Sequence, residues 1–339
     1  MRSMIRPTER RRVGFVGLCL ALLCAAVLVS LAYGSRSIPF GDVLAALFSG
    51  ADSDDATVIT SQRLPRTLLG LACGLALGMA GALMQGHTRN PLADPGLFGV
   101  NAGATFAVAL VVFAADVTSP PAIVLAALLG AAAATVLIFL LGLRGSSSGG
   151  SLVLLAVIGT TVTALLTALT SALVLLDRAT LDVMRFWEVG ALSNRDYSLM
   201  GWILPLLVAG VVLAVLNATS LNRLGLGEEV AHTQGTSVRR SRLVGIGAIT
   251  LLVGPVTAMC GPIAFLGLVA PHAARAVTGP DQRWLVPCAG LIGAAVLLLA
   301  DTLGRVVQEH GELQVGIVMA LVGAPVLLAV TRRRRLVAL

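Results

Sequence analysis

The sequence predicts an all-α, polytopic membrane protein with about ten transmembrane helices. Of the 339 residues, 57% are hydrophobic and 12% are charged, whereas an ordinary soluble domain carries roughly 25% charged residues. The mean hydropathy of +0.92 excludes a soluble fold. A spanning helix with its share of loop takes about 30 residues, so the chain accommodates on the order of ten spans. We expect one transmembrane domain over residues 1–339.

Apolar runs of spanning length follow one another along the whole chain. A helix needs about 20 apolar residues to cross the hydrocarbon core of a bilayer. The eighth run follows the seventh after only Gly261-Pro262, which predicts either a tight hairpin or one broken helix. The runs lie at 13–34, 67–85, 96–115, 121–143, 151–176, 199–217, 242–260, 262–278, 284–303 and 313–331.

The arginine distribution favours the hairpin and ten full spans. With a cytoplasmic N-terminus, 17 of the 24 arginines fall in cytoplasmic segments and 7 fall outside, as the positive-inside rule requires. The two ends contribute Arg2, Arg6, Arg10 to Arg12 and Arg332 to Arg335. Both termini are therefore expected in the cytoplasm.

The residue types that are missing or dispersed exclude several functions. The chain contains no lysine, so it carries neither a Walker A phosphate loop nor a Schiff-base lysine. Any ATP hydrolysis must come from a partner chain. The five cysteines show no CxxC spacing and the four histidines are scattered, which predicts no metal site and no resident cofactor. The arginines lie among hydrophobic runs rather than on one polar face, which argues against nucleic-acid binding.

Intramembrane charge argues against an ion-driven carrier. Asp301 is the only acid well within an apolar run, and Arg305 lies one helical turn later, where it can pair with Asp301. Proton-coupled carriers use chains of carboxylates and histidines near mid-membrane. A secondary transporter is therefore the weaker alternative, and no nucleophile–base cluster indicates an enzyme.

Four segments contain candidate functional or packing residues. Residues 35–66 open with a run whose Phe40, Val43, Leu44 and Leu47 share one helical face, which predicts a short surface helix. The segment ends in Arg63 and Arg66, which either anchor the next helix in lipid headgroups or dock an acidic partner. The second span carries a small-residue stripe typical of close helix packing, namely Gly70, Gly74, Gly78 and Ala82.

The fifth span carries hydroxyl side chains along one face. Thr160, Thr163, Thr167 and Thr170 recur at helical spacing, so they either border a path for a polar solute or bond back to their own helix. The segment at 218–241 contains Glu228, Glu229, Val230 and Ala231 followed by Gly235. This pattern indicates a short helix with a glycine C-cap, which is either a solvated loop or a contact for a cytosolic partner.

Taken together, four stretches resemble the FecCD-type permeases, the membrane subunits of ABC importers for ferric siderophores, haem and cobalamin. They span nearly the whole chain in order. The stretches are RLPRTLLGLACGLALGMAGALMQGHTRNPLADPGLFGVNAGA at 63–104, LNRLGLGEEVAHTQGTSVRRSRL at 221–243, GPIAFLGLVAPHAAR at 261–275, and LLLADTLGRVV with ELQVGIVMALVGAPVLLAV within 297–330.

The resemblance implies the type II importer fold, with ten helices per subunit and two permease chains around a central path. In that family the fifth, eighth and tenth helices border the path, which makes Thr160, Thr163 and Thr167 candidate lining residues. Ferric siderophore is the expected cargo, and haem or cobalamin are the alternatives. The expected location is the bacterial cytoplasmic membrane.

The resemblance also implies the partners. Glu228, Glu229, Val230, Ala231 and Gly235 match the motif that couples the permease to a cytosolic ATPase dimer. Arg63, Arg66 and Arg305 match the positions that dock an extracytoplasmic substrate-binding protein, and Asp301 then orients Arg305. The second permease chain is either another copy or a related chain.

Overall fold

The computed structural model describes residues 9–48, 53–144, 152–308 and 311–332, and these ranges are helical with no β-strand. Some of the arginines on which the predicted topology rests lie outside the described ranges, namely Arg2, Arg6 and Arg333 to Arg335. The helices are α1 Glu9–Ala32, α2 Phe40–Phe48, α3 Asp54–Val58, α4 Leu64–Thr88, α5 Val100–Ala115, α6 Pro120–Arg144, α7 Leu152–Leu176, α8 Arg178–Trp187, α9 Met200–Gly225, α10 Glu228–Thr233, α11 Val238–Cys260, α12 Leu266–Thr278, α13 Gln282–Val307 and α14 Val315–Arg332.

Each of the ten predicted runs overlaps one helix of this set, in chain order α1, α4, α5, α6, α7, α9, α11, α12, α13 and α14. Within the described ranges, seven helical segments are long and apolar enough to cross a membrane by themselves, and α5 and α14 are shorter apolar helices. The α-helical membrane fold is confirmed, and the count of ten is approximate because α12 has only 13 residues.

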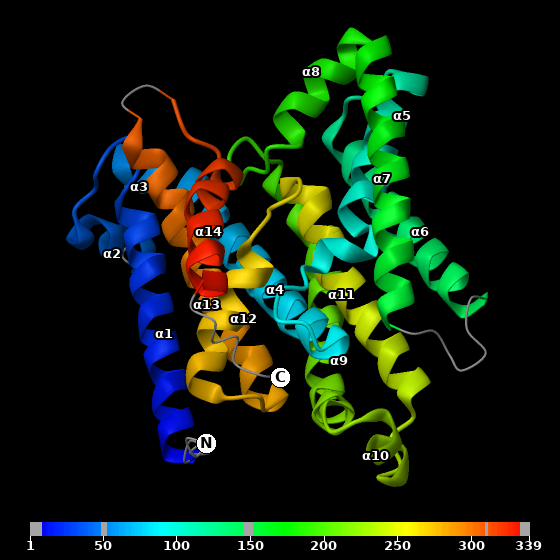
Figure 1. Ribbon diagram of the computed structural model, residues 1–339. Helices are drawn as coiled ribbons and strands as arrows, with labels where there is room; N and C mark the ends of the chain where they lie inside the picture. Colours follow the sequence, from blue (N-terminus) through cyan, green and yellow to red (C-terminus); the bar gives the residue numbers. More distant parts are fainter. Residues whose placement is uncertain (1–8, 49–52, 145–151, 309–310, 333–339) are drawn as a thin grey trace.

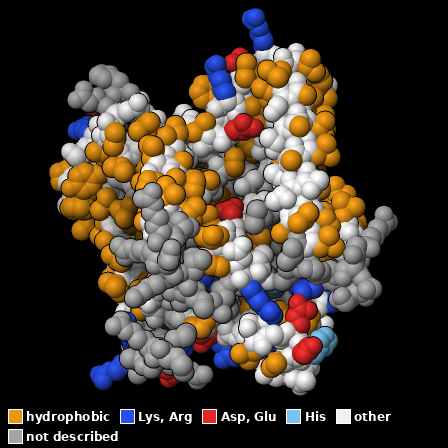
Figure 2. Space-filling model, in the orientation of Figure 1, with side chains coloured by type: hydrophobic (Ala, Val, Ile, Leu, Met, Phe, Trp, Pro, Cys, Tyr) orange, Lys and Arg blue, Asp and Glu red, His pale blue; other side chains and the backbone are white. Residues whose placement is uncertain are grey.

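The helices run between two ends of the bundle (Figure 1). One end carries the start of α1 together with α10, and we call it the α10 end. The other carries α3 and α8 near the start of α4, and we call it the α8 end. Hydrophobic side chains cover much of the flanks, charged side chains gather toward the two ends, and the face in Figure 2 is hollowed between its two sides.

Two surface helices accompany the spans at the α8 end. The predicted short helix is α2, whose Val43 is fully buried while Phe40 and Leu44 are about half exposed. The other, α8, was not predicted. Asp177 precedes it and accepts hydrogen bonds from the Thr180 N–H and hydroxyl, which caps its first turn.

The second span is longer than predicted. Asp54–Thr88 forms one 35-residue helical segment, because α3 continues through a π-helical turn at Ile59–Arg63 into α4. Pro65 lacks an N–H and its ring crowds the preceding turn. The wider π turn directly before the proline accommodates that ring without ending the helix.

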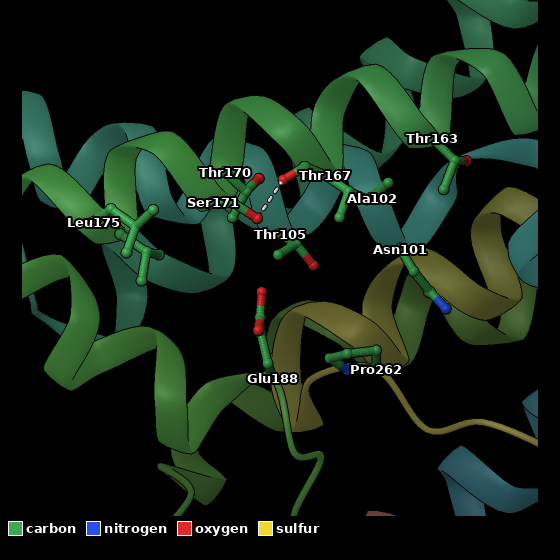
Figure 3. Close-up of a pocket in the computed structure, with 11 residues that line it drawn as sticks. Asn101, Ala102, Thr105, Thr163, Thr167, Thr170, Ser171, Leu175, Glu188 and Pro262 are labelled. Carbon is green, nitrogen blue, oxygen red and sulfur yellow. Dashed lines mark hydrogen bonds between the residues drawn. The ribbon is translucent and has the colours of Figure 1, made fainter.

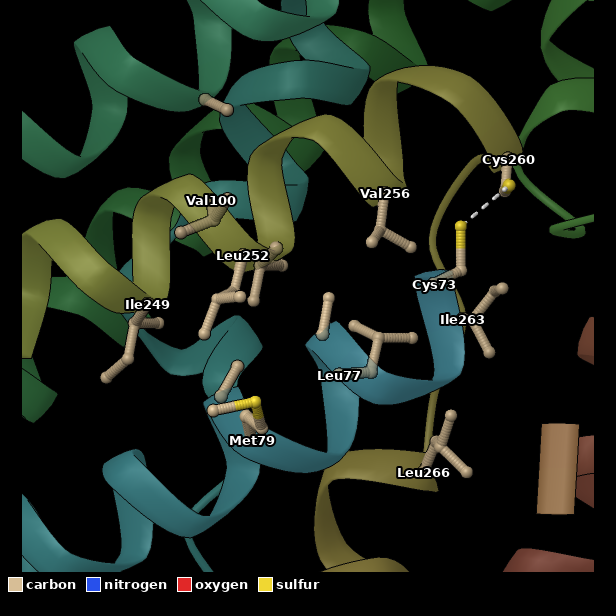
Figure 4. Packing of buried hydrophobic residues seen from close by; sticks show 14 of the residues in the cluster. Cys73, Leu77, Met79, Val100, Ile249, Leu252, Val256, Cys260, Ile263 and Leu266 are labelled. Atoms are coloured by element: carbon tan, nitrogen blue, oxygen red, sulfur yellow. Dashed lines mark hydrogen bonds between the residues drawn. The ribbon is translucent and has the colours of Figure 1, made fainter. Parts of the chain in front are cut away.

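The small-residue stripe of α4 is confirmed as a packing surface. A Cβ atom on Gly78 would lie 2.1 Å from the Ala289 carbonyl oxygen of α13, and one on Gly81 would lie 2.0 Å from the Gly267 oxygen of α12. The backbones therefore touch directly, as small residues permit in membrane helices. Leu77 and Cys73 of α4 pack against Leu252, Val256 and Cys260 of α11 in the main core cluster (Figure 4).

The chain reverses direction between α11 and α12, as the hairpin alternative predicts. On α4, residue His87 faces Gly245 of α11 and Cys73 faces Cys260, so α11 runs antiparallel to α4. Gly81 faces Gly267 of α12, so α12 starts beside the middle of α4.

The prediction of a full eighth span at 262–278 is wrong at its start. Residues 261–264 are extended and α12 begins at Leu266. Gly261 has φ 77°, a conformation that glycine adopts without steric cost. Hydropathy alone does not reveal this irregular segment, because its residues are as apolar as those of a helix.

Candidate functional site

A cavity of about 620 Å³ lies between α5, α7, the residue after α8 and the extended segment at Pro262. Figure 3 shows polar side chains of α5 and α7 facing Glu188 and Pro262 across it. Among its lining residues Glu188 carries the one charged side chain, and partial burial raises the pKa of that carboxyl. The polar lining consists of Asn101, Thr105, Thr163, Thr167, Thr170, Ser171 and Glu188.

Some hydroxyl side chains of the predicted stripe line the cavity, and others bond back to their own helix. Thr163 and Thr167 line the cavity, whereas Thr160 is absent from the lining and donates its hydroxyl to the Val157 carbonyl at 2.9 Å. Thr170 and Ser171 line the cavity while their hydroxyls donate to their own helix. The Thr163 hydroxyl is buried without a hydrogen-bond partner among the described residues.

The three predicted docking arginines converge at the α8 end. Arg63, Arg66 and Arg305 border a second cavity of about 610 Å³, together with Arg36, Asp55 and Glu312. The side chains come from the start of α4 and the end of α13. The sequence does not indicate this meeting by spacing, because packing alone brings the two helices together.

These arginines are buried, and they form hydrogen bonds and ion pairs with other residues of the same chain. Arg66 donates two hydrogen bonds to Asp301, at 2.9 and 2.8 Å, and one to Glu312 at 2.7 Å. Arg305 lies 3.3 Å from Asp301 and also bonds Ser30, whereas Arg63 donates to the carbonyls of residues 31, 32 and 36. The expected Asp301–Arg305 pair is present, and Asp301 additionally holds Arg66. Only 3–9% of each arginine is exposed.

The predicted helix at 228–233 is present as α10 and projects from the bundle (Figure 1). Ala231 packs with Leu224 and Val238 in a small cluster that fastens α10 to α9 and α11. Glu229 and Val230 are exposed, while Glu228 pairs with Arg242 at 2.6 Å. Gly235 follows the helix with φ 73°, the left-handed conformation that the glycine C-cap predicts.

Comparisons with known proteins agree with this architecture. The model of the FecCD transport family matches residues 22–333. The ferric enterobactin transport system permease protein FepD of Escherichia coli (strain K12) is 44% identical over 96% of both chains. The hemin transport system permease protein HmuU of Yersinia pestis is 36% identical, covering 99% of this chain and 98% of that protein.

The chain belongs to the FecCD transport family. A solved structure of a metal-chelate type ABC transporter in an inward-facing conformation superposes with a TM-score of 0.83 at 27% identity, covering 95% of this chain and 99% of that one. The chain is thus an ABC transporter permease and an integral inner-membrane protein.

This FecCD-family permease also contains a polar network that was not predicted. The Asn217 side-chain amide of α9 lies 2.8 Å from His87 Nε2 of α4, and the Ser241 hydroxyl of α11 donates to Asn217 at 2.8 Å. A Cβ on Gly245 would lie 1.8 Å from the same histidine nitrogen. The network joins three helices near α10, and a single histidine or asparagine in an apolar run gives no sequence signal for it.

Proposed function

We propose that this permease carries a ferric siderophore through the hydroxyl-lined cavity between α5 and α7. The observation that carries the proposal is a cavity of about 620 Å³ in an apolar helix bundle, whose lining contains five hydroxyl side chains and one amide. Hydroxyl and amide groups solvate a metal chelate without binding it too tightly to leave. Relatives named for ferric enterobactin, Fe(3+)-citrate and hemin transport support a metal-chelate cargo.

The α10 end is proposed to face the cytoplasm, with both termini there. Arginines at this end, including Arg89, Arg223, Arg240 and Arg283, support the orientation through the positive-inside rule. The cargo then enters from the α8 end, where a substrate-binding protein docks. Docking through Arg63, Arg66 and Arg305 requires a partner carboxylate to replace acceptors that these arginines now hold.

A separate ATPase dimer is proposed to dock on α10. The exposed side chains of Glu229 and Val230 supply the contact, and the Ala231 cluster transmits its movement to α9 and α11. A second permease chain is proposed to cover the exposed face of α7, where Leu165 and Leu175 are 58% and 86% exposed. In this proposal the permease performs no bond chemistry and holds no cofactor. It provides the path for the cargo and transmits the movement of the ATPase to the helix bundle.

The partner assignment is tested by co-purification. The tagged chain is extracted from its native membrane in mild detergent, and stoichiometric partners are identified by mass spectrometry. We expect an ATPase chain, and any related permease chain recovered with it distinguishes a heterodimer from a homodimer. Recovery of this chain alone, under conditions that keep a known ABC importer intact, contradicts the importer assignment.

Transport is tested in proteoliposomes that contain the permease, its ATPase and its binding protein. We expect ATP-dependent uptake of an iron-loaded siderophore. The double change Glu228→Arg and Glu229→Arg should leave ATPase activity without uptake, whereas Glu9→Arg, an exposed charge reversal at the same end, should leave uptake intact. Uptake of haem or cobalamin instead of the siderophore reassigns the cargo, and unchanged uptake by the double variant rejects α10 as the coupling helix.

A further inference from the structure

The cavity between α5 and α7 contains one charged side chain, Glu188, to which the proposed function gives no role. Glu188 directly follows α8, and its carboxylate points toward Thr105 and Ser171 across the cavity in Figure 3. The other ten lining residues are uncharged. Within the described ranges no ion pair involves Glu188, unlike Asp182, which pairs with Arg185 on the surface of α8. The cavity therefore holds an uncompensated negative group beside its hydroxyls.

Close backbone contacts fix the chain on both sides of Glu188. A Cβ on Gly261 would lie 2.1 Å from the Trp187 oxygen, one on Gly190 would lie 2.4 Å from the Pro262 oxygen, and one on Gly316 would lie 1.8 Å from the Val189 oxygen. The Ala191 N–H also donates to the Cys260 carbonyl at 2.8 Å. The chain on both sides of Glu188 is thus clamped between the extended segment and the start of α14.

A fixed charge in a cavity discriminates between cargoes by their net charge. The interaction of two unit charges about 10 Å apart is large enough to change a rate about twofold in a water-like environment. At an effective dielectric constant of about 20, the same interaction changes the rate about tenfold or more. A chelate with several negative charges experiences this repulsion several times over. Iron(III) held by three catecholates is strongly anionic, whereas iron(III) held by three hydroxamates is neutral.

We propose that Glu188 makes the path charge-sensitive, so that of two chelates with the same shape the one with less negative charge crosses faster. The inference rests on the proposed function, because it assumes that the chelate crosses this cavity. Glu188 acts here as a specificity residue that faces the cargo, in addition to the hydroxyls that line the path.

The test changes the charge of the cargo while keeping its shape. The chelator that the binding protein delivers is loaded either with gallium(III) or with a tetravalent ion of similar size such as germanium(IV) or titanium(IV), which makes the complex less negative. ATP-dependent uptake of each complex is measured in proteoliposomes with the complete importer and saturating binding protein. The readout is the ratio of the tetravalent to the trivalent uptake rate.

We expect this ratio to be about two- to tenfold in the unaltered chain, to fall toward one in Glu188→Gln, and to remain high in Glu188→Asp. Asp182→Asn is the matched control, because it removes a negative charge from α8 outside the cavity, and it should keep the ratio of the unaltered chain. A ratio that is the same in Glu188→Gln as in the unaltered chain overturns the inference. Absence of ATP-dependent uptake of any chelate by the unaltered importer instead rejects the proposed function.

Discussion

Asp301 shows what individual buried charges require in this protein. Its carboxylate is 1% exposed and lies between the guanidinium groups of Arg66 and Arg305. Two cations and one anion in an apolar bundle are stable only when each remaining donor finds an acceptor. Glu312, Ser30 and Thr302 supply acceptors for the terminal guanidinium nitrogens, while Arg305 Nε has only its 3.3 Å ion-pair contact with Asp301.

Replacing Asp301 with asparagine should therefore destabilise the fold strongly. Removing one partner of a buried pair leaves an uncompensated charge and costs about 3–5 kcal/mol. Asp182→Asn is the control, because Asp182 and its partner Arg185 are 64% and 57% exposed and such surface pairs contribute about 0–1 kcal/mol. Thermal unfolding of the detergent-solubilised chains measures both, and equal melting temperatures for the two variants contradict the expectation.

The Asp301–Arg305 contact was predictable, but its extension to Arg66 was not. Residues one turn apart on a helix face each other, so the local pair follows from spacing. Arg66 is 235 residues away, and its approach depends on how α4 packs against α13. The burial of all three arginines could not be read from the sequence either, because the same side chains commonly sit in lipid headgroups.

At the scale of single elements, α8 depends on one ionised cap. Hydrogen bonds from the Thr180 hydroxyl and N–H lower the pKa of Asp177. A carboxyl with a lowered folded-state pKa stabilises the fold above its unfolded pKa, and this stabilisation is lost as the pH falls through the folded value. The start of α8 should therefore loosen in acid.

This pH dependence can be followed through Trp187, which is buried at the end of α8. In a chain with Trp202→Phe and Trp284→Phe, its fluorescence should change reversibly as the pH falls below the ordinary aspartate pKa of about 3.9. Asp177→Asn should remove this transition, because asparagine caps a helix without titrating. An identical transition in the asparagine variant places its origin elsewhere.

The contact between α4 and its neighbours should be intolerant of a single methyl group. Gly81→Ala places a carbon 2.0 Å from the Gly267 oxygen, so the helices must separate at a cost above the about 1–3 kcal/mol typical of overpacking. Gly247→Ala meets nothing within 4 Å and should be neutral or stabilising. The yield of monodisperse protein after detergent extraction compares the two, and equal yields refute the tight-packing argument.

Element types were largely predictable and their partners were not. Small-residue spacing on the second span indicated close packing, while the choice of α12 and α13 as neighbours is a property of the assembled bundle. The extended segment before α12 and the helix α8 were missed. The first has the hydropathy of a helix, and the second is a short polar helix that a search for apolar runs does not reveal.

At the scale of the whole molecule, α4 joins two groups of helices. It packs against α12 and α13 on one side and against α9 and α11 on the other. In Figure 1, α1, α13 and α14 lie apart from α5, α6 and α7, with α4 crossing between them. Rigid-body movement of such groups is a common way for a binding event to reach a distant site.

Two cysteine pairs test whether the groups move. Cys73 of α4 and Cys260 of α11 have their sulfurs 3.5 Å apart, and Cys19 of α1 contacts Cys288 of α13. Oxidative cross-linking of the first pair should stop transport reversibly, because it ties α4 to the α11 group. Cross-linking of the second pair should be harmless, since both helices belong to one group. Each pair is tested with the other removed by serine, and normal uptake through a cross-linked Cys73–Cys260 chain excludes movement at this contact.

The shortness of α12 has a consequence for how the protein enters the bilayer. Its 13 residues extend only about 20 Å at 1.5 Å per residue, against a hydrocarbon core of about 30 Å. The extended residues before it leave backbone groups that lipid cannot satisfy. This segment therefore cannot be released sideways from the insertion machinery as an independent unit. It has to be sheltered until α4 and α13 are in place, which makes late assembly around α4 a step in the biogenesis of the permease.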